Sequence, residues 1–600
     1  MAKRLTRAEV PVEETWNLDD LFPSKEAWEQ ALKELERDLV TVTQYKGRIA
    51  EGPGILLAAC LAQEALYQRF LVVANYASLH LSADGTDPTN QEMAGRAGDL
   101  NSKLEAAVSF VRSELLALPD GTLERYFAEE PELGKFRRTL ERTMEEKPHV
   151  LSPETEVALA SLGEVFESPY TVYQRAKLTD MTFAPIKDEQ GNELPMSFAG
   201  YEGKYEKSEN VAIRRAAYAS FADGLEAYQN TLGATFATEV KKNVVISRLR
   251  RYPSATHMQL HSQEIPIEVY NNILDVIFTQ LAPHMRRYAE LRKRVLGLDK
   301  MLYCDIEAPL DPEYNPKMTY QEAQKLIVDA LRVLGPEYTE IMEAAFRDRW
   351  IDWCDNIGKS TGAFCSAAYG VHPYILTTWP DNMRGAFTLA HELGHAGHFE
   401  LSSRNNRLAD AMLVSTFFVE APSTMNELLL ADYILARHTE TRMRRWVIMG
   451  LLQTYHHNFV RHLLEGELQR RIYALAEEGQ TITAKTLSTV KGQILSDFWG
   501  DTVEIDDGAR LTWMRQPHYY MGLYPYTYAA GLTISTAVAQ DIKTQGQPAV
   551  ERWLEVLKAG GIKKPLELAQ MAGVDMSKPD PIRKAVAYVG SLVDEVEKTF

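Results

Sequence analysis

The sequence predicts a mainly α fold with one small β element, and three observations support this prediction. Apolar residues recur at helical spacing over most of the 600-residue chain. Residue types that start helices precede several of these stretches. Residues 361–379 differ, because they are rich in glycine, aromatic and β-branched residues and poor in charge. We therefore expect many packed helices and one or two strands.

The first part of the chain predicts antiparallel helices joined by short loops. A helix over 25–38 follows Ser24, a residue type that caps helix N-termini. Two longer stretches, 55–82 and 89–118, have apolar residues at helical spacing. Pro88 suits the first turn of the second stretch, where a missing N–H costs nothing.

A hairpin and a domain boundary are predicted next. Residues 181–198 contain helix-breaking prolines, and apolar runs flank Gln190-Gly191-Asn192 in the manner of a hairpin. We place a boundary near residue 205, which separates an N-terminal helical domain, 1–205, from a second domain, 206–600. Farther on, Thr319 and Glu322 form a capping-box pattern that opens another helix.

Charge and composition exclude some classes of partner. The formal net charge of −18 disfavours a general nucleic-acid or anionic-membrane binder, since both need basic surface. The four cysteines form no CxxC pair and predict no disulfide framework. The N-terminus lacks an apolar signal region, and no apolar run approaches the roughly 18 residues of a membrane span. We expect a cytoplasmic protein, and nothing in the sequence sets its oligomeric state.

The segment His391-Glu392-Leu393-Gly394-His395 predicts a zinc site. Residues four apart share one face of a helix, so His391 and His395 can present their imidazoles to one ion. Glu392 lies beside that face and can act as a base without ligating. His398 lies seven residues from His391, about 10.5 Å along the helix axis, so one tetrahedral ion cannot easily take all three.

A third protein ligand is needed, and several carboxylates are candidates. Glu400 is too far along the same helix, which leaves Asp410, Glu420 and Glu427. Glu420 lies in the apolar segment FFVEAPSTMNELLL, where a lone buried carboxylate needs a reason such as metal ligation. Glu427 comes two turns later and suits a hydrogen bond to a ligand imidazole.

Residues 518–528 hold the richest cluster of side-chain hydrogen-bond donors. Five tyrosines and a histidine fall within these eleven residues. A developing oxyanion needs such a donor in addition to a metal. For Tyr519 and Tyr520 we favour simple aromatic packing.

These motifs together resemble the thimet-type oligopeptidase family of zinc peptidases, and in particular its bacterial branch, oligoendopeptidase F. That branch has GKxxGAF, then HPY, then FTLAHELGHAxH, which match residues 358–364, 372–374 and 387–398. The sequence FFVEAPSTMNE follows at the family's distance, and WNLDDLF at 16–22 resembles the branch's opening. The resemblance covers nearly the whole chain.

The resemblance implies a role for each candidate residue. It implies one Zn²⁺ ion held by His391, His395 and Glu420, with Glu392 as general base. It implies that His518 and Tyr528 stabilise the intermediate and that Tyr524 binds substrate, with Tyr526 as an alternate. It further implies that domain 1–205 covers a deep enclosed channel and that 206–600 is the catalytic domain.

The predicted strand segment gives an expectation for the substrate. An extended peptide binds a sheet edge through backbone hydrogen bonds, and 362–374 can supply such an edge beside the active-site helix. Glycine there lets a peptide backbone come close, so we expect Gly362 and Ala363 to contact substrate. The expected activity is hydrolysis of internal bonds in short oligopeptides.

The sequence also leaves two other functions open. A dipeptidyl carboxypeptidase of the same family would need a cation for the free C-terminus of its substrate, and none stands out in the sequence. A non-catalytic peptide-binding or structural zinc protein would not need Glu392, because structural zinc sites are closed and use no base.

Overall fold

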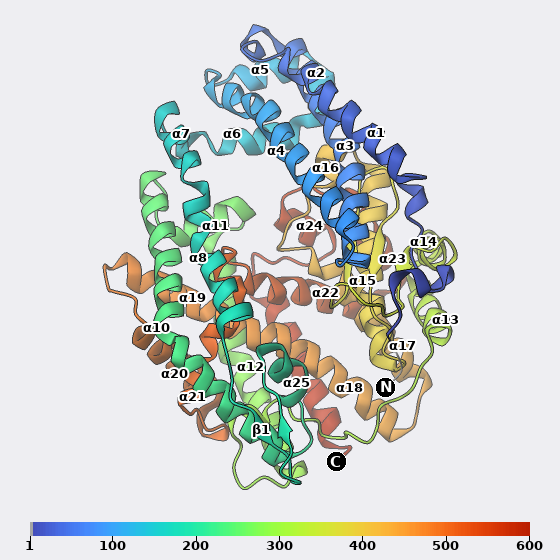
Figure 1. Ribbon diagram of the computed structural model, residues 1–600, viewed down its shortest axis with the longest axis vertical. Helices are drawn as coiled ribbons and strands as arrows, with labels where there is room; N and C mark the ends of the chain where they lie inside the picture. Colours follow the sequence, from blue (N-terminus) through green and yellow to red (C-terminus); the bar gives the residue numbers. More distant parts are fainter. Residues whose placement is uncertain (1–3) are drawn as a thin grey trace. The chain divides into compact units, whose positions relative to one another are not determined.

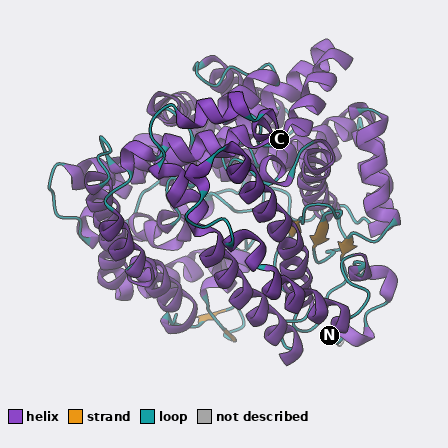
Figure 2. Cartoon of the chain, turned by 90° about the horizontal axis from the view of Figure 1, so that it is seen from above, coloured by secondary structure: helices purple, strands orange, loops and turns teal. Residues whose placement is uncertain are grey.

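The computed structural model describes residues 4–600, and helices make up most of it (Figures 1 and 2). The mainly α prediction is confirmed. Two compact units form, each from three stretches of chain. The first consists of Met1–Pro148, Pro316–Tyr433 and Val538–Gly573, and the second of His149–Asn315, Ile434–Ala537 and Val574–Phe600. The predicted division at residue 205 concerns functional domains and stays a prediction, while the compact units have other boundaries.

The first unit contains three kinds of element: an N-terminal helical layer, a three-stranded sheet, and the helices that follow the sheet. Its helices are α1 (Lys25–Asp38), α2 (Val40–Thr43), α3 (Pro53–Ala83), α4 (Pro88–Ala117), α5 (Thr122–Glu129), α6 (Arg137–Glu145), α13 (Tyr320–Leu331), α14 (Pro336–Arg347), α15 (Met383–Asn405), α16 (Leu408–Ala411), α23 (Gln547–Ala559) and α24 (Pro565–Met571). Helices α17 (Glu420–Arg437) and α22 (Pro525–Gln545) contribute residues to both units.

The helical layer is built on α3, which packs along α4 and α1. Helix α3 is long and apolar enough to span a membrane by length and composition alone, which is weak evidence for a span. The expectation that no segment comes close to a span was therefore wrong for this stretch. In this structure, Leu56, Phe70 and Val73 of α3 belong to the hydrophobic core of the first unit.

The small sheet of the first unit has strand order β3-β5-β4. Strands β3 (Ile351–Asp352) and β5 (Tyr374–Leu376) are parallel, and β4 (Phe364–Ser366) pairs antiparallel with β5. The predicted strands within 361–379 are thus confirmed as β4 and β5, and β4 lies at a sheet edge. Helix α15 packs against both of them.

The motif residues outside α15 support this sheet. Trp16 packs edge-on against Tyr374 at 6.2 Å, and the Tyr374 hydroxyl donates to the carbonyl of Asn17 at 3.2 Å. His372 Nε2 lies 3.1 Å from an Asp20 carboxylate oxygen. The segments 16–22 and 372–374 therefore contact each other.

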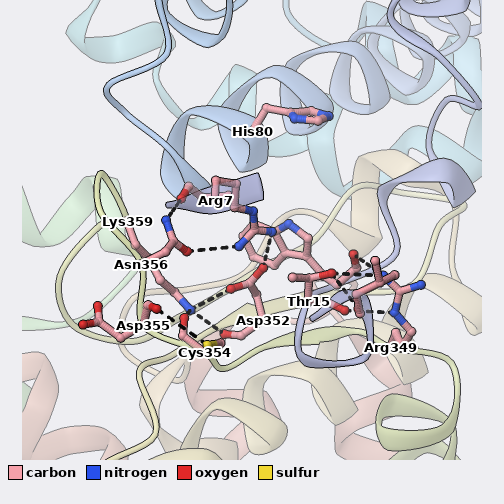
Figure 3. A network of polar contacts seen from close by, with 12 residues as sticks. Arg7, Thr15, His80, Arg349, Asp352, Cys354, Asp355, Asn356 and Lys359 are labelled. Carbon is pink, nitrogen blue, oxygen red and sulfur yellow. Dashed lines mark hydrogen bonds and ion pairs between the residues drawn. The ribbon is translucent and has the colours of Figure 1, made fainter. Parts of the chain in front are cut away.

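A network of hydrogen bonds and ion pairs joins residues 7–15 to residues 349–359, which precede β4 (Figure 3). The Lys359 ammonium is buried and donates to Asp352 at 2.6 Å, and Arg7 contacts the other oxygen of the same carboxylate at 2.5 Å. Arg349 donates to the carbonyl of Thr15 at 3.0 Å. The lysine of the GKxxGAF motif thus has a structural role here.

The second unit is helical apart from one short hairpin. Its helices are α7 (Pro153–Ser161), α8 (Gly163–Arg175), α9 (Phe198–Gly200), α10 (Val211–Leu249), α11 (Ala255–Gln263), α12 (Ile267–Val295), α18 (Thr441–Tyr455), α19 (His462–Glu477), α20 (Ala484–Trp499), α21 (Asp507–Arg510) and α25 (Asp580–Glu597). Strands β1 (Ile186–Lys187) and β2 (Glu193–Leu194) pair antiparallel, as predicted for 181–198.

Candidate functional site

Helix α15 carries the HExxH segment in the first unit. It begins at Met383, because the Asn382 side chain caps it by accepting from the backbone N–H groups of Arg384 and Gly385. His391 and His395 lie one turn apart with ring centroids 5.1 Å from each other. The predicted placement of both histidines on one helical face is therefore confirmed.

Close packing of α15 against α17 sets the position of the third carboxylate. A Cβ built on Gly394 would lie 2.4 Å from the carbonyl oxygen of Pro422 and 2.5 Å from Cα of Ser423, so only glycine lets the backbones approach this closely. Asn426 adds a tie by donating to the Ala390 carbonyl at 3.1 Å. Glu420, the first residue of α17, is thereby brought beside the two imidazoles.

The donor atoms converge at a separation that suits zinc. Glu420 Oε2 lies 3.5 Å from His391 Nε2 and 3.7 Å from His395 Nε2. Bond lengths of about 2.0–2.1 Å in a tetrahedral site require roughly 3.3 Å between ligand atoms. Ser423 Oγ donates to the same Glu420 oxygen at 3.1 Å and orients it. The residues present fit a zinc ion.

A second carboxylate orients the first imidazole. Glu427 Oε1 lies 2.7 Å from His391 Nδ1, which donates this bond, so Nε2, on the side of Glu420, would supply the lone pair to a metal ion. The sequence analysis predicted a hydrogen bond between Glu427 and a histidine of the site, and the structure contains it at His391.

The charges of this cluster also suit a cation. Burial opposes ionisation of Glu420, but the hydrogen bond from His391 and the charges of both histidines lower its pKa to about 2. Burial favours the neutral form of His391, yet its hydrogen bonds to Glu420 and Glu427 raise its pKa well above the ordinary value. A proton on His391 thus balances the carboxylates, and a metal ion would replace that proton.

Glu392 has the environment of a base. Its side chain is 6% exposed, and no residue within the described range 4–600 hydrogen-bonds its carboxylate. Burial raises its pKa to about 7. A buried carboxylate with free lone pairs can take a proton from a water molecule placed against it.

Gly362 and Ala363 lead directly into the edge strand β4. Gly362 has a φ of +86°, and a Cβ at this position would meet no atom within 4 Å, so the space over it is open. Burial raises the pKa of Cys365 in β4, and the charge of Glu392 adds to this shift, which places the carboxylate near this strand. The edge is therefore close to the proposed base.

The other candidate ligands lie outside the convergent group. His398 is 2% exposed and packs edge-on against Phe418 at 5.8 Å, and burial lowers its pKa to about 3. Glu400 pairs with Arg404 on the same helix. Asp410 lies on the short helix α16 and does not join the His391, His395 and Glu420 group.

His518, Tyr524 and Tyr528 form a cluster within the second unit. The His518 ring stacks on Tyr524 at 5.5 Å and 14°, and Tyr528 lies edge-on to both, at 5.7 Å from His518 and 5.3 Å from Tyr524. Burial and the neighbouring His462 lower the pKa of His518 to about 4, so its imidazole is neutral near pH 7. The three residues carried over by resemblance are therefore neighbours.

Tyr526 does not fit a substrate contact in this structure. It is 0% exposed, and its hydroxyl donates to Gln263 at 2.6 Å while its ring packs edge-on against Tyr270. Tyr526 and Tyr528 both lie on α22, and side chains two residues apart on a helix point to nearly opposite sides, so Tyr526 faces away from Tyr528. Tyr519 stacks on Phe236 at 4.7 Å, and Tyr520 bonds Thr235 at 3.0 Å, as expected for packing residues.

Sequence reasoning missed the residues that support this cluster. His462 stacks on Tyr528 at 4.2 Å and 15°, and it donates from Nδ1 to Glu465 at 2.8 Å. Its Nε2 lies 3.0 Å from His457 Nε2, within hydrogen-bond distance. The available signal was a histidine and a glutamate at i and i+3 in the apolar helical stretch HLLEGEL.

The Gly394 contact gives a testable prediction. We expect Gly394→Ala to weaken zinc binding, because its methyl group would push α17 and Glu420 away from the histidines. Overpacking of this kind also destabilises a fold by about 1–3 kcal/mol. Zinc affinity and melting temperature measure the two effects. Gly98→Ala in α4, where nothing lies within 4 Å of the added Cβ, is the matched control and should lose neither. An unchanged zinc affinity in Gly394→Ala would contradict the contact's role.

The chain is similar to two protein-family models, to several named bacterial proteins and to solved structures. The sequence matches Peptidase family M3 over residues 204–588 and Oligopeptidase F over residues 114–183. It is 33% identical to oligopeptidase PepF of Bacillus subtilis, covering 99% of this chain and 88% of the relative. It is 28% identical to the plasmid oligoendopeptidase F of Lactococcus lactis subsp. cremoris, covering 100% and 99%. The crystal structure of oligoendopeptidase-F from Enterococcus faecium superposes with a TM-score of 0.75 at 28% identity, covering 96% and 99%.

Proposed function

This chain belongs to peptidase family M3, and we propose that it is a zinc-dependent endopeptidase that hydrolyses internal bonds of short oligopeptides. The observation that carries the proposal is the convergence of His391, His395 and Glu420 beside the unpaired carboxylate of Glu392. We also propose a cytoplasmic location, which fits the sequence features described above.

Each residue of the first unit has a defined task in this proposal. His391, His395 and Glu420 would hold one zinc ion, which when bound supplies a Lewis acid for the scissile carbonyl and the attacking water. Glu392 takes a proton from that water and delivers it to the leaving amine. The edge of β4, entered through Gly362 and Ala363, pairs with the extended substrate backbone.

The cluster of the second unit supplies neutral donors. By the family resemblance, Tyr528 and His518 would donate hydrogen bonds to the oxyanion of the tetrahedral intermediate, and Tyr524 would bind the substrate. A neutral His518 keeps one N–H for donation without bringing a full charge.

The direct test uses a quenched fluorescent peptide blocked at both ends. An endopeptidase cleaves it, whereas a dipeptidyl carboxypeptidase needs a free C-terminus. Activity should disappear with a chelator and return with zinc. Cleavage that survives complete removal of metal would exclude the zinc mechanism, and cleavage of unblocked peptide only would favour the carboxypeptidase.

We further expect the enzyme to act on short peptides and to spare large substrates. The names of the relatives, which are oligopeptidases, support this restriction. Intact casein and its tryptic fragments, incubated side by side and analysed by mass spectrometry, provide the measurement. Fragments should be cleaved while intact casein stays whole, and rapid internal cleavage of intact casein would refute the restriction.

A further inference from the structure

A small cavity lies within the second unit, and it adjoins the group of His462, Glu465 and His518 through Glu465. Its volume is about 20 Å³, enough for roughly one water molecule or one small ion. The lining residues with polar side-chain groups are Tyr303, Arg461, Glu465, Lys491, Trp499, Thr512, Arg515 and Gln516. Three of these residues carry a positive charge and one carries a negative charge.

Lys491 is the unusual member of this lining. It lies on α20, is 4% exposed, and has no hydrogen bond or ion pair with any residue in the described range 4–600. Burial lowers its pKa to about 8, with Glu465 opposing that shift and Arg515 and Arg461 adding to it. A buried ammonium is costly when it has lost its water and makes no hydrogen bond or contact ion pair in exchange.

The two arginines differ from Lys491, since each has carboxylate partners outside the cavity. Arg515 donates to both oxygens of Glu206 at 2.8 and 3.0 Å, and Arg461 lies 3.4 Å from Glu307. Both arginines therefore have carboxylate partners that do not line the cavity, whereas Lys491 has no ion pair among the described residues.

Glu465, the one carboxylate among the lining residues, does not form an ion pair with Lys491. Glu465 accepts the Nδ1 proton of His462 at 2.8 Å, and no ion pair within 4.0 Å joins it to Lys491 among the described residues. A divalent cation at the nearby His462, Glu465 and His518 group would break this hydrogen bond and face the charge of Lys491. The electrostatics of the cavity thus favour an anion over a cation.

We propose that this cavity is a binding site for one small monovalent anion of the halide class, such as chloride, with Lys491 as its principal ligand. Arg461 and Arg515 add attraction, and the hydroxyls of Tyr303 and Thr512 line the same space. A volume of about 20 Å³ favours a monatomic anion over the larger sulfate and phosphate ions and over the carboxylate end of a peptide. Arg515 closes the short helix Leu511–Arg515, directly before the Pro517–Tyr520 helix that carries His518, so a bound ion would brace this segment.

Bromide diffraction on the full chain tests the site directly. Crystals equilibrated in sodium bromide should show an anomalous bromine peak in the cavity, next to Lys491 Nζ. Water alone in the cavity at saturating bromide would overturn the proposal. This measurement uses the unaltered protein and no peptide, so its outcome is independent of whether the proposed peptidase activity is correct.

Solution measurements give a second test with matched variants. Exchange of sodium gluconate for sodium chloride at constant ionic strength should raise the melting temperature by on the order of 1–2 °C, because a ligand of the native state stabilises it. Lys491→Met should abolish the rise, whereas Lys485→Met, at an exposed position of the same helix, should keep it. An equal chloride effect in both variants would overturn the role of Lys491.

Discussion

Glu392→Gln is expected to remove nearly all peptide hydrolysis while leaving the fold and the metal content unchanged. Glutamine has almost the same shape, but its amide cannot take a proton from the attacking water. General-base catalysis contributes about 10²–10⁴-fold, so kcat should fall by that factor. Steady-state kinetics on the blocked peptide, combined with metal analysis of the same samples, provide the measurement.

The control for this variant lies on the same helix. Glu400→Gln removes a carboxylate that pairs with Arg404, two turns beyond Glu392, and it should leave kcat near the wild-type value. If Glu392→Gln kept more than about a tenth of the wild-type rate, Glu392 would not be the base.

Glu420→Ala is expected to have the second large effect, which is loss of zinc. Removal of one of three protein ligands leaves two imidazoles and a buried gap. Glu427→Ala should weaken zinc binding less, by about 10–100-fold, because Glu427 only orients the His391 ring. Zinc content after dialysis against a series of zinc buffers gives both affinities.

Asp410, another candidate for the third ligand in the sequence analysis, provides the control. Asp410→Asn should retain full zinc, since Asp410 is outside the group of converging ligand atoms. Full zinc retention in Glu420→Ala together with loss in Asp410→Asn would reverse the assignment. Near-ultraviolet circular dichroism separates ligand loss from unfolding in each variant.

The sequence predicted most helices because their signals are local. The cap at Ser24 and the capping box at Thr319 and Glu322 are present as expected, with Ser24 accepting from Ala27 N–H at 3.3 Å. Such signals depend on residues within one turn of each other. The expectation that no apolar stretch has the length of a membrane span was wrong for α3. Length and composition alone do not distinguish such a span from a helix of a protein core, and residues of α3 belong to the hydrophobic core of the first unit.

The spacing along the chain predicts that His391 and His395 share one face of a helix with Glu392 beside them, since residues four apart on a helix have one geometry. Only the tertiary structure placed a carboxylate opposite them. That position depends on the approach of α15 and α17 at Gly394, which no spacing along the chain records. Likewise, the tyrosines of 518–528 look equivalent in sequence, but helix direction buries Tyr526 against Gln263 and leaves Tyr528 beside His518. Local periodicity fixes which residues share an element, whereas packing between elements decides which of them meet.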